Sequence, residues 1–419
     1  MGRRVVVIGG GPAGIAAVRA LLGESPEFDI LVLESRHDFG GLWNYSPTKG
    51  PMYRNLDANV PRDLLGFANF PFPGHDSDES YPTRQEVLSY IRSYSIEVTR
   101  NKNVQVHFNS IVTSVSKDIT INKWVIVTDK EETFLSDLLL LSTGHYEFPL
   151  WPPIPGLRGH PGALHSVDYD VPEEFLNKKL LMIGNSRSGT DIAIQLISTV
   201  TSITISRRKE GPLDHIFDEA TGIVTWKPEV EKIIGRAVYF KDGSCEVFDR
   251  ILTCTGYLYD FPFLKDEQAA VPILEKNRSR LQGLYKHTIF AEDPTLATLG
   301  MNKGMVPFPT FETQGAVIAR IWNGRLRLPE LSIMIEEEKQ ILRDRGVAEK
   351  FHDLPMLLDI DFMKLLWDWA DEAPGGFIAE RWSPKKLDRR KDSLEAKLQE
   401  DIANLRWSLG AREKRLSTN

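Results

Sequence analysis

The stretch Gly9-Gly10-Gly11-Pro12-Ala13-Gly14, which follows the apolar run Val5-Val6-Val7-Ile8, decides the fold of the N-terminal part. The apolar run predicts a buried strand, and the glycines match the loop that binds a dinucleotide pyrophosphate. Gly9 makes a tight turn, Gly11 lets the pyrophosphate approach the backbone, and Gly14 lets the next helix pack closely. That helix is expected from Pro12 to about Leu22, with its positive end toward the phosphates.

A carboxylate stands where such a loop needs a ribose ligand. The next predicted strand, Ile30–Leu33, ends in Glu34, which lies 20 residues after Gly14. A carboxylate there accepts hydrogen bonds from ribose hydroxyls and repels a 2′-phosphate. The first unit is therefore predicted to bind a dinucleotide, and the alternative is a glycine-rich turn before an ordinary helix.

A second motif, Gly184-Asn185-Ser186-Arg187-Ser188-Gly189, follows the apolar run Leu180–Ile183. Ser186 replaces the middle glycine, although its hydroxyl can meet a phosphate. The following strand, 202–206, ends in Arg207 and Arg208 rather than in an acid. Arginine at this position accommodates a 2′-phosphate, so the second unit is predicted to bind NADPH. The alternative is a solvated basic cluster with Lys209.

Composition excludes several classes of protein. A chain of 419 residues exceeds what one hydrophobic core usually serves, so two domains are expected. The net charge of −7 argues against nucleic-acid binding. Two cysteines without a Cys-x-x-Cys motif exclude the disulfide reductases and indicate a reducing compartment, here the cytoplasm. We expect no metal site, and no membrane anchor because no apolar stretch reaches about 18 residues.

The two units share a layout. In the first, the strand 138–141 runs into Ser142-Thr143-Gly144, and in the second the strand 250–253 runs into Cys254-Thr255-Gly256-Tyr257. A proline-rich crossing, 149–156, precedes the second unit. The expected fold class is α/β, with two Rossmann-like dinucleotide-binding domains, the second inserted into the first, and a helical C-terminal segment. Helices are expected at 336–345, 362–373 and 392–409.

Several segments resemble those of the flavin-containing monooxygenases, particularly the shorter soluble type of yeasts, and the resemblance runs to about Pro329. They are Glu34 followed by Gly40-Gly41-Leu42-Trp43; Asn59-Val60-Pro61; Thr253–Tyr257; and Pro307-Phe308-Pro309 with Glu312 and Gln314. The fingerprint of this class is Phe-x-Gly-x3-His-x3-(Phe/Tyr). Only its second half is present in this chain, as His165-x3-Tyr169. Tyr169 stands where Baeyer–Villiger relatives carry Trp. We interpret His165 as a structural hydrogen-bonding histidine without a role in proton transfer.

The resemblance implies FAD and NADPH as cofactors. An FAD-binding domain is expected at 1–170 and again within 289–419, where a helical C-terminal segment follows, and an NADPH-binding domain at 171–288. The residues expected to contact FAD are Gly9, Gly11, Pro12, Ala13, Gly14, Glu34, Gly41, Leu42, Trp43, Val112, Thr143, Gly144 and Gln314. The residues expected to contact NADPH are Gly184, Asn185, Ser186, Ser188, Gly189, Arg207, Arg208, Thr255, Gly256 and Tyr257.

The resemblance also implies a reaction. NADPH reduces the flavin, O2 adds at C4a, and the hydroperoxide gives its distal oxygen to a soft sulfur or nitrogen atom of a small molecule. Such chemistry includes S-oxygenation and N,N-dimethylaniline monooxygenase activity. Asn59 is the expected catalytic residue, because its amide can donate and accept a hydrogen bond to the hydroperoxide. Its alternative role is that of a turn residue before Pro61.

Other functions stay open at this stage. Within enzymes they are an N-hydroxylating or Baeyer–Villiger flavin monooxygenase and an uncoupled NADPH oxidase that releases hydrogen peroxide. Outside enzymes, a nucleotide-binding sensor is the alternative. The expected partners are the small-molecule substrate and O2. The sequence leaves the oligomeric state open, with a homodimer as one option.

Overall fold

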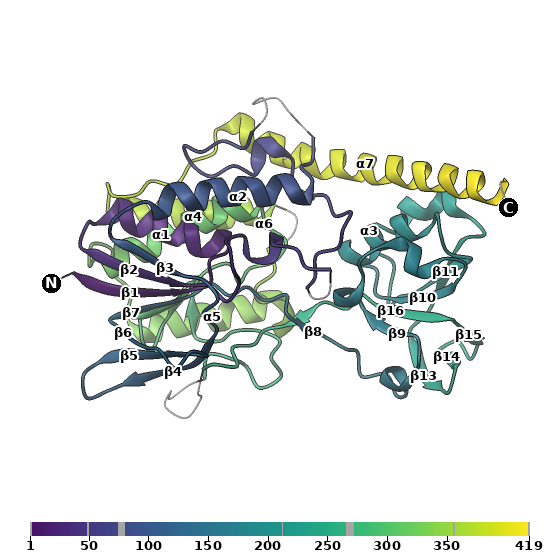
Figure 1. The fold of residues 1–419 in the computed structure, drawn as a ribbon, viewed down its shortest axis with the longest axis horizontal. Helices are drawn as coiled ribbons and strands as arrows, with labels where there is room; N and C mark the ends of the chain where they lie inside the picture. The colour runs from purple at the N-terminus through teal and green to yellow at the C-terminus, as the bar shows by residue number, and fades with distance from the viewer. Residues whose placement is uncertain are drawn as a thin grey trace. The chain divides into compact units, whose positions relative to one another are not determined.

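The computed structural model describes residues 2–47, 50–73, 80–211, 213–264, 272–354 and 357–417. The chain folds into two compact units, each built from three segments (Figure 1). Unit 1 contains Met1–Asn44, Asp57–His145 and Leu258–Lys391, and unit 2 contains Tyr45–Leu56, Tyr146–Tyr257 and Asp392–Asn419.

The second unit is thus inserted into the first, but the bounds of the units differ from the expected ranges. The main segment of unit 2 begins at Tyr146 instead of 171 and ends at Tyr257 instead of 288. The last segment of the chain also belongs to unit 2, since its apolar side chains join the core of that unit.

Unit 1 contains a seven-stranded sheet whose order is β18-β19-β20-β7-β1-β2-β3. The strands from β20 to β3 are parallel, and β18 and β19 add an antiparallel edge. The bounds are β1 Arg3–Ile8, β2 Phe28–Leu33, β3 Val104–His107, β7 Leu138–Leu141, β18 Leu284–Tyr285, β19 Ile289–Phe290 and β20 Leu296–Thr298.

Both faces of this sheet are covered, which explains why the central strands β1, β2 and β7 contain continuous apolar runs. Val5 and Val7 of β1 point into one core cluster, and Val6 and Ile8 point into another. Helices cover the first face and a three-stranded antiparallel sheet covers the second (Figure 1). These elements are α1 Pro12–Glu24, α2 Arg84–Thr99, α4 Pro307–Trp322, α6 Leu358–Asp371, β4 Val112–Asp118, β5 Lys123–Thr128 and β6 Thr133–Ser136.

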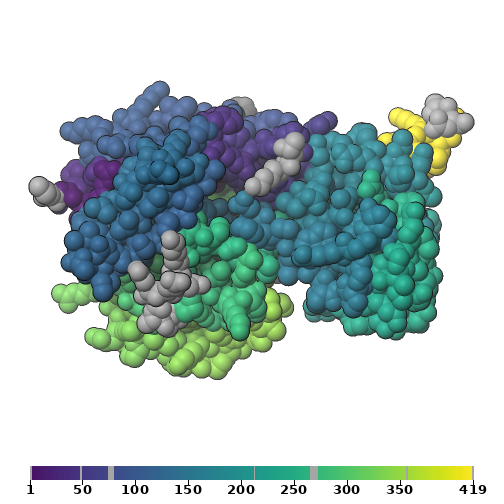
Figure 2. Space-filling view, turned by 60° about the horizontal axis from the view of Figure 1, so that its bottom comes forward, coloured from purple at the N-terminus to yellow at the C-terminus, as the bar shows by residue number. Residues whose placement is uncertain are grey.

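Helices α1 and α4 approach each other closely because small residues line their contact. A Cβ atom on Gly315 of α4 would lie 3.2 Å from Ala20 Cβ and 3.4 Å from Ala16 O of α1. The space-filling view shows the N-terminal segment of unit 1 and its segment after residue 258 packed into one body (Figure 2). The remaining helix of this unit, α5 Leu331–Arg345, begins five residues before the expected helix.

Unit 2 repeats the arrangement with a parallel sheet of order β12-β11-β10-β16-β9. Leu180 and Met182 of β10 face one core cluster, whereas Leu181 and Ile183 face the cluster formed with a second antiparallel sheet. The bounds are β9 Ala163–His165, β10 Lys179–Ile183, β11 Ser202–Ser206, β12 Val224–Lys227, β16 Arg250–Thr253, β13 Val230–Ile234, β14 Ala237–Phe240, β15 Cys245–Val247 and α3 Arg187–Leu196.

Helix α7, Pro384–Ser417, is longer than the expected helix 392–409; it begins in unit 1 and continues into unit 2. The short strands β8 Phe148–Pro149 and β17 Tyr257–Leu258 pair with each other. Within the described part of the chain, no helix combines the length and the apolar character that crossing a membrane requires.

Candidate functional site

The glycine loop of unit 1 leaves no room for side chains at two of its positions. Gly9, with a φ of +111°, follows β1, and a Cβ atom on it would lie 2.5 Å from Ser142 O. A Cβ atom on Gly14 would lie 2.1 Å from Gly9 O. Gly11 precedes α1 as its N-cap. The loop therefore directs the N-terminus of α1 across the carboxyl end of β1, where a pyrophosphate binds in such folds.

The segment Gly41–Trp43 lies directly against this loop. Gly41 has a φ of +51°, and a Cβ atom on it would lie 2.8 Å from Gly11 Cα. Arg36 Nη1 donates a hydrogen bond to Gly41 O at 3.1 Å, which ties the segment to the end of β2. Leu42 and Trp43 are half-buried. The structure thus brings together two stretches that the sequence assigns to one cofactor.

Glu34 contacts the same loop through its carboxylate. Its Oε2 accepts a hydrogen bond from Gly10 N at 2.6 Å, and its Oε1 accepts one from Arg36 N at 2.8 Å. The residue is buried, and Oε1 also accepts a hydrogen bond from Ser35 Oγ at 3.3 Å, so Oε2 is the oxygen that keeps a further acceptor site for a ribose hydroxyl. The acid is therefore held in place before any ligand binds.

The carboxyl end of the same sheet carries further residues of the predicted site. Thr143 and Gly144 follow β7 and are exposed, and Gly144 has a φ of +74°. Gln314 on α4 is buried and donates from Nε2 to Asn302 Oδ1 at 3.0 Å. Val112 stands apart from them in β4 of the antiparallel sheet.

Two buried polar atoms in this region lack a partner among the described residues: Gln314 Oε1 and Asn302 Nδ2. A buried polar atom without a hydrogen bond costs free energy. Two such atoms close together are therefore expected where a bound ligand supplies the missing hydrogen-bond partners. The residues present therefore fit a polar cofactor at this place. Sequence reasoning missed Asn302, whose only local signal is its position after an apolar strand and a glycine.

Asn59 lies in a bend of unit 1 between two buried neighbours, Ala58 and Val60. Its own side chain is exposed, and no hydrogen bond to it is found among the described residues. Ala58 N donates to Pro82 O at 2.9 Å, which fixes the bend. The amide is thus anchored by its backbone and available at its side chain.

The loop that follows Asn59 is held by an aromatic stack and a buried acid. The Phe67 ring lies between Tyr94 and Phe308, with centroid distances of 4.0 Å and 4.8 Å. Glu312 accepts hydrogen bonds from Ala68 N at 2.7 Å and from Tyr94 Oη at 3.0 Å. Burial raises the pKa of Glu312 to about 7. This support makes the bend a rigid part of unit 1.

The second glycine loop has the same backbone geometry as the first. Gly184 has a φ of +104°, and a Cβ atom on it would lie 2.7 Å from Cys254 O. A Cβ atom on Gly189 would lie 2.7 Å from Gly184 O. Ser186 is the N-cap of α3, the position that Gly11 holds before α1, and its side chain makes no capping bond. Asn185 is half-buried, and Ser188 is exposed.

Arg207, at the end of β11, is fixed by two groups that the sequence did not single out. Its guanidinium carbon lies 4.1 Å from the centroid of the Trp226 ring, and its Nη1 contacts Asp214. Asp214 also accepts a hydrogen bond from Asn185 Nδ2 at 3.0 Å. This carboxylate therefore joins the glycine loop to the arginine.

The structure separates the two adjacent arginines. The side chain of Arg208 is 84% exposed, and its Nε contacts Glu229 Oε1 at 2.9 Å. The side chain of Arg207 is 17% exposed. Only Arg207 thus lies beside Asn185 of the glycine loop.

His165 supports the other predicted segment of unit 2, Thr255-Gly256-Tyr257. Its Nδ1 accepts a hydrogen bond from Val167 N at 3.2 Å, so Nε2 carries the proton and donates to Gly256 O at 3.1 Å. Burial lowers the pKa of His165 to about 4, so the ring is neutral at pH 7. The contacts of this histidine are those of a structural residue.

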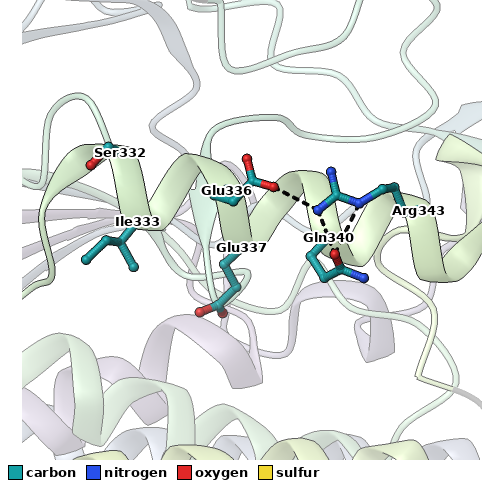
Figure 3. A pocket seen from close by; sticks show the side chains of 6 residues that line it. All are labelled: Ser332, Ile333, Glu336, Glu337, Gln340 and Arg343. Atoms are coloured by element: carbon teal, nitrogen blue, oxygen red, sulfur yellow. Dashed lines mark hydrogen bonds and ion pairs between the residues drawn. The ribbon is translucent and has the colours of Figure 1, made fainter.

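A shallow hollow on α5 is unrelated to either loop. It has a volume of about 510 Å³ and is lined by residues of one helix only: Ser332, Ile333, Glu336, Glu337, Gln340 and Arg343. Figure 3 shows the Arg343 side chain directed back toward Glu336 and Gln340. Arg343 binds Glu336 and Gln340, and Glu337 binds Lys286, so these charged groups already have partners and we assign the hollow no ligand.

Comparison with known proteins agrees with the two-loop arrangement. The family model described as flavin-binding monooxygenase-like matches residues 2–219 and 217–353. A trimethylamine monooxygenase of Methylocella silvestris is 34% identical over 370 residues, covering 83% of this chain and 79% of that protein. A thiol-specific monooxygenase of Saccharomyces cerevisiae is 28% identical over 429 residues, covering 96% and 93%.

Solved structures show the same fold. The S-allyl-L-cysteine S-oxygenase of Allium sativum superposes with a TM-score of 0.80 and 24% identity, over 98% of this chain and 99% of that one. The expected α/β class with two Rossmann-like domains is therefore confirmed. The chain belongs to the flavin-binding monooxygenase-like family, and it is an oxidoreductase that uses FAD, NADPH and O2 to oxygenate a small molecule.

Proposed function

We propose that this enzyme transfers one oxygen atom of O2 to a soft nucleophilic sulfur or nitrogen atom of a small molecule. The main support for the proposal is the pair of glycine loops. Their backbones are equivalent, but the side chains at the ribose position have opposite charges. Glu34 faces the first loop, and Arg207 lies beside the second. This difference supports FAD in unit 1 and NADPH in unit 2.

The balance of the reaction follows from these two cofactors. NADPH, a proton, O2 and the substrate give NADP⁺, water and the oxygenated substrate. When bound, the flavin supplies the electron transfer from NADPH and the activation of O2. The protein binds both nucleotides, orients them and excludes water from the oxygen that is to be transferred.

In unit 1, we propose that the glycine loop and Glu34 hold the pyrophosphate and the ribose of FAD. Gly41–Trp43, Thr143 and Gly144 would contact the rest of the cofactor, together with Val112. Gln314 and Asn302 would each gain a partner through their buried, unpaired atoms. In unit 2, the loop 184–189 would hold the pyrophosphate of NADPH. Arg207 would bind its 2′-phosphate, with Thr255, Gly256 and Tyr257 at the neighbouring strand end and Arg208 at the rim.

The named relatives support the substrate class. One is called a trimethylamine monooxygenase, one a thiol-specific monooxygenase and one an S-allyl-L-cysteine S-oxygenase. In each name the atom that would be oxidised is a soft nitrogen or sulfur. We also retain a homodimer and a cytoplasmic location as predictions, the latter supported by the free state of Cys245 and Cys254.

Turnover against a substrate panel tests the function. The purified enzyme with FAD is given NADPH, O2 and, separately, a thioether, a thiol, trimethylamine and N,N-dimethylaniline. We expect at least one of these compounds to be oxygenated in step with NADPH consumption. Hydrogen peroxide in place of product from every compound would identify an NADPH oxidase. An ester formed from a cyclic ketone would identify a Baeyer–Villiger enzyme.

Gly11→Val should yield protein without FAD. A Cβ atom at this position would already lie 3.3 Å from Gly41 Cα, and the valine methyl groups extend further into the path of the pyrophosphate. The measurement is the ratio of flavin absorbance at 450 nm, roughly the usual flavin maximum, to protein absorbance after purification.

Gly159→Ala is the matched control, because a Cβ atom there meets nothing within 4 Å. This variant should keep its full FAD content. If Gly11→Val also binds one FAD per chain, the proposed FAD site in unit 1 is wrong.

The two arginines should differ in their effect on nucleotide preference. Arg207→Ala removes a charge-assisted contact worth about 1.5–3 kcal/mol, so the preference for NADPH over NADH should fall roughly tenfold to a hundredfold. Arg208→Ala should leave most of this preference, because its side chain is 84% exposed and no contact between it and the glycine loop is found among the described residues. The rate of flavin reduction under argon, measured with each nucleotide, separates the two variants. Equal preference in wild type and Arg207→Ala would contradict the assignment.

Asn59→Leu should uncouple the enzyme while leaving its reduction intact. Leucine is similar in size but offers no polar group, and a lost hydrogen bond of about 1–1.5 kcal/mol corresponds to roughly tenfold in a competing decay. We therefore expect more hydrogen peroxide per NADPH consumed in the presence of a good substrate. Anaerobic reduction by NADPH, followed by stopped-flow absorbance, serves as the internal control and should be near normal. Wild-type coupling in this variant would mean that Asn59 is only a turn residue.

A further inference from the structure

The last part of α7 belongs to the core of unit 2. Leu405 is fully buried in the same cluster as Ile192 and Leu196 of α3. Its neighbours Leu398, Ile402 and Leu409 pack against that cluster at helical spacing. The C-terminal helix is therefore a layer of the unit that carries the second glycine loop.

Basic residues of α7 hold the C-terminal end of α3 and the turn after it. Arg412 donates hydrogen bonds to Ile197 O at 3.1 Å and to Thr201 O at 2.9 Å. Arg415 Nε donates to Ser198 O at 2.9 Å. These carbonyl groups belong to the C-cap residue Ile197 and to the turn after it, and a cation beside the C-terminus of a helix is stabilised by the partial negative charge there.

An acid of α7 holds the other end of α3. Asp401 binds Arg187 through both Nη atoms, with Nη1–Oδ2 and Nη2–Oδ1 distances of 2.5 Å and 2.9 Å. The Asp401 side chain is only 2% exposed, and Lys397 Nζ lies 3.4 Å from its Oδ1. Such a two-bond pair has a fixed geometry, which a single contact lacks.

Arg187 lies at the point where the second glycine loop passes into helix α3. It directly follows Ser186, the N-cap of α3, and is the first residue of that helix, as Pro12 is of α1. In the first unit a proline ring restricts the backbone there. In the second unit the bond to Asp401 restrains the same position from outside.

We propose that Asp401 is a positioning residue for NADPH: through Arg187 it holds the turn 184–189 in the conformation that presents the N-terminus of α3 to the pyrophosphate. This inference rests on the proposed binding of NADPH by unit 2. Without the bond, the turn must be ordered when the nucleotide binds, and that cost lowers affinity. Asp401 itself need not touch the nucleotide.

The test is the dissociation constant for NADP⁺, measured by calorimetric titration of the FAD-loaded enzyme, so the readout is binding and not activity. We expect Asp401→Asn and Arg187→Gln each to raise this constant about tenfold, and the double variant to raise it no further, because both remove one interaction. FAD content should stay unchanged in these variants, because FAD is assigned to unit 1. Asp401→Glu, which keeps the carboxylate, should restore part of the affinity.

Two further variants distinguish a positioning role of the Asp401–Arg187 pair from a general effect on the stability of unit 2. Arg406→Ala removes the exposed ion pair with Glu219 from the same helix and should not change the affinity for NADP⁺. Arg187→Lys leaves a cation for the buried Asp401 but no two-bond geometry. It should fold and bind NADP⁺ more weakly than wild type.

If Asp401→Asn lowers the melting temperature but keeps wild-type affinity for NADP⁺, the inference is overturned. Helix α7 would then only stabilise unit 2. Arg207→Ala distinguishes this failure from that of the proposed function. If Arg207→Ala weakens NADP⁺ binding and Asp401→Asn does not, only the inference fails. If neither variant changes it, NADPH binding by unit 2 fails as well.

Discussion

The close approach of a helix to the strand before it is the constraint on which both units depend. At Gly14 and at Gly189 a Cβ atom would lie 2.1 Å and 2.7 Å from the carbonyl oxygen of the glycine that opens the loop. No side chain fits at either position. The helix therefore begins directly above the carboxyl end of its strand, and its free N–H groups are directed at whatever binds there. The strand ends that follow in each unit, after β7 and after β16, lie beside the same spot because they pair with β1 and β10.

Because the two glycine loops have equivalent backbones, a few side chains beside them decide which nucleotide each loop binds. In unit 1 the carboxylate of Glu34 is held by two backbone N–H groups, so it is oriented but keeps acceptor capacity. In unit 2 the Arg207 guanidinium is oriented by an aromatic face and by an acid. One charge is thus fixed by the main chain and the other by side chains from further along the sequence. Unit 2 accordingly depends more on the identity of particular side chains.

The different ways in which Glu34 and Arg207 are fixed explain which parts of the fold and of the candidate site could be predicted from the sequence. The strands β1 and β10 and the backbone of both loops follow from local patterns, and the structure agrees with these. The charges at Glu34 and Arg207 also follow from local patterns, and their roles toward the two nucleotides stay predictions. Asp214, Trp226 and Asp401 act through contacts that no spacing rule encodes. The bounds of the units were missed for the same reason, because 45–56 and 392–419 join unit 2 only by packing. Helix α2 was not predicted, although Thr83 and Glu86 form a capping box at its start.

The three-part composition of unit 2 has a consequence for biosynthesis. Its glycine loop and sheet leave the ribosome long before residues 392–417, which supply Leu405 to the core, the acid that binds Arg187, and the arginine that binds the carbonyl of Ile197 after α3. Until those residues emerge, an apolar face of the unit is uncovered and an arginine lacks its acid. The nascent chain therefore passes through a stage in which the sheet and the glycine loop of unit 2 are present but its core is not yet closed, and helix α7 docks onto the unit later.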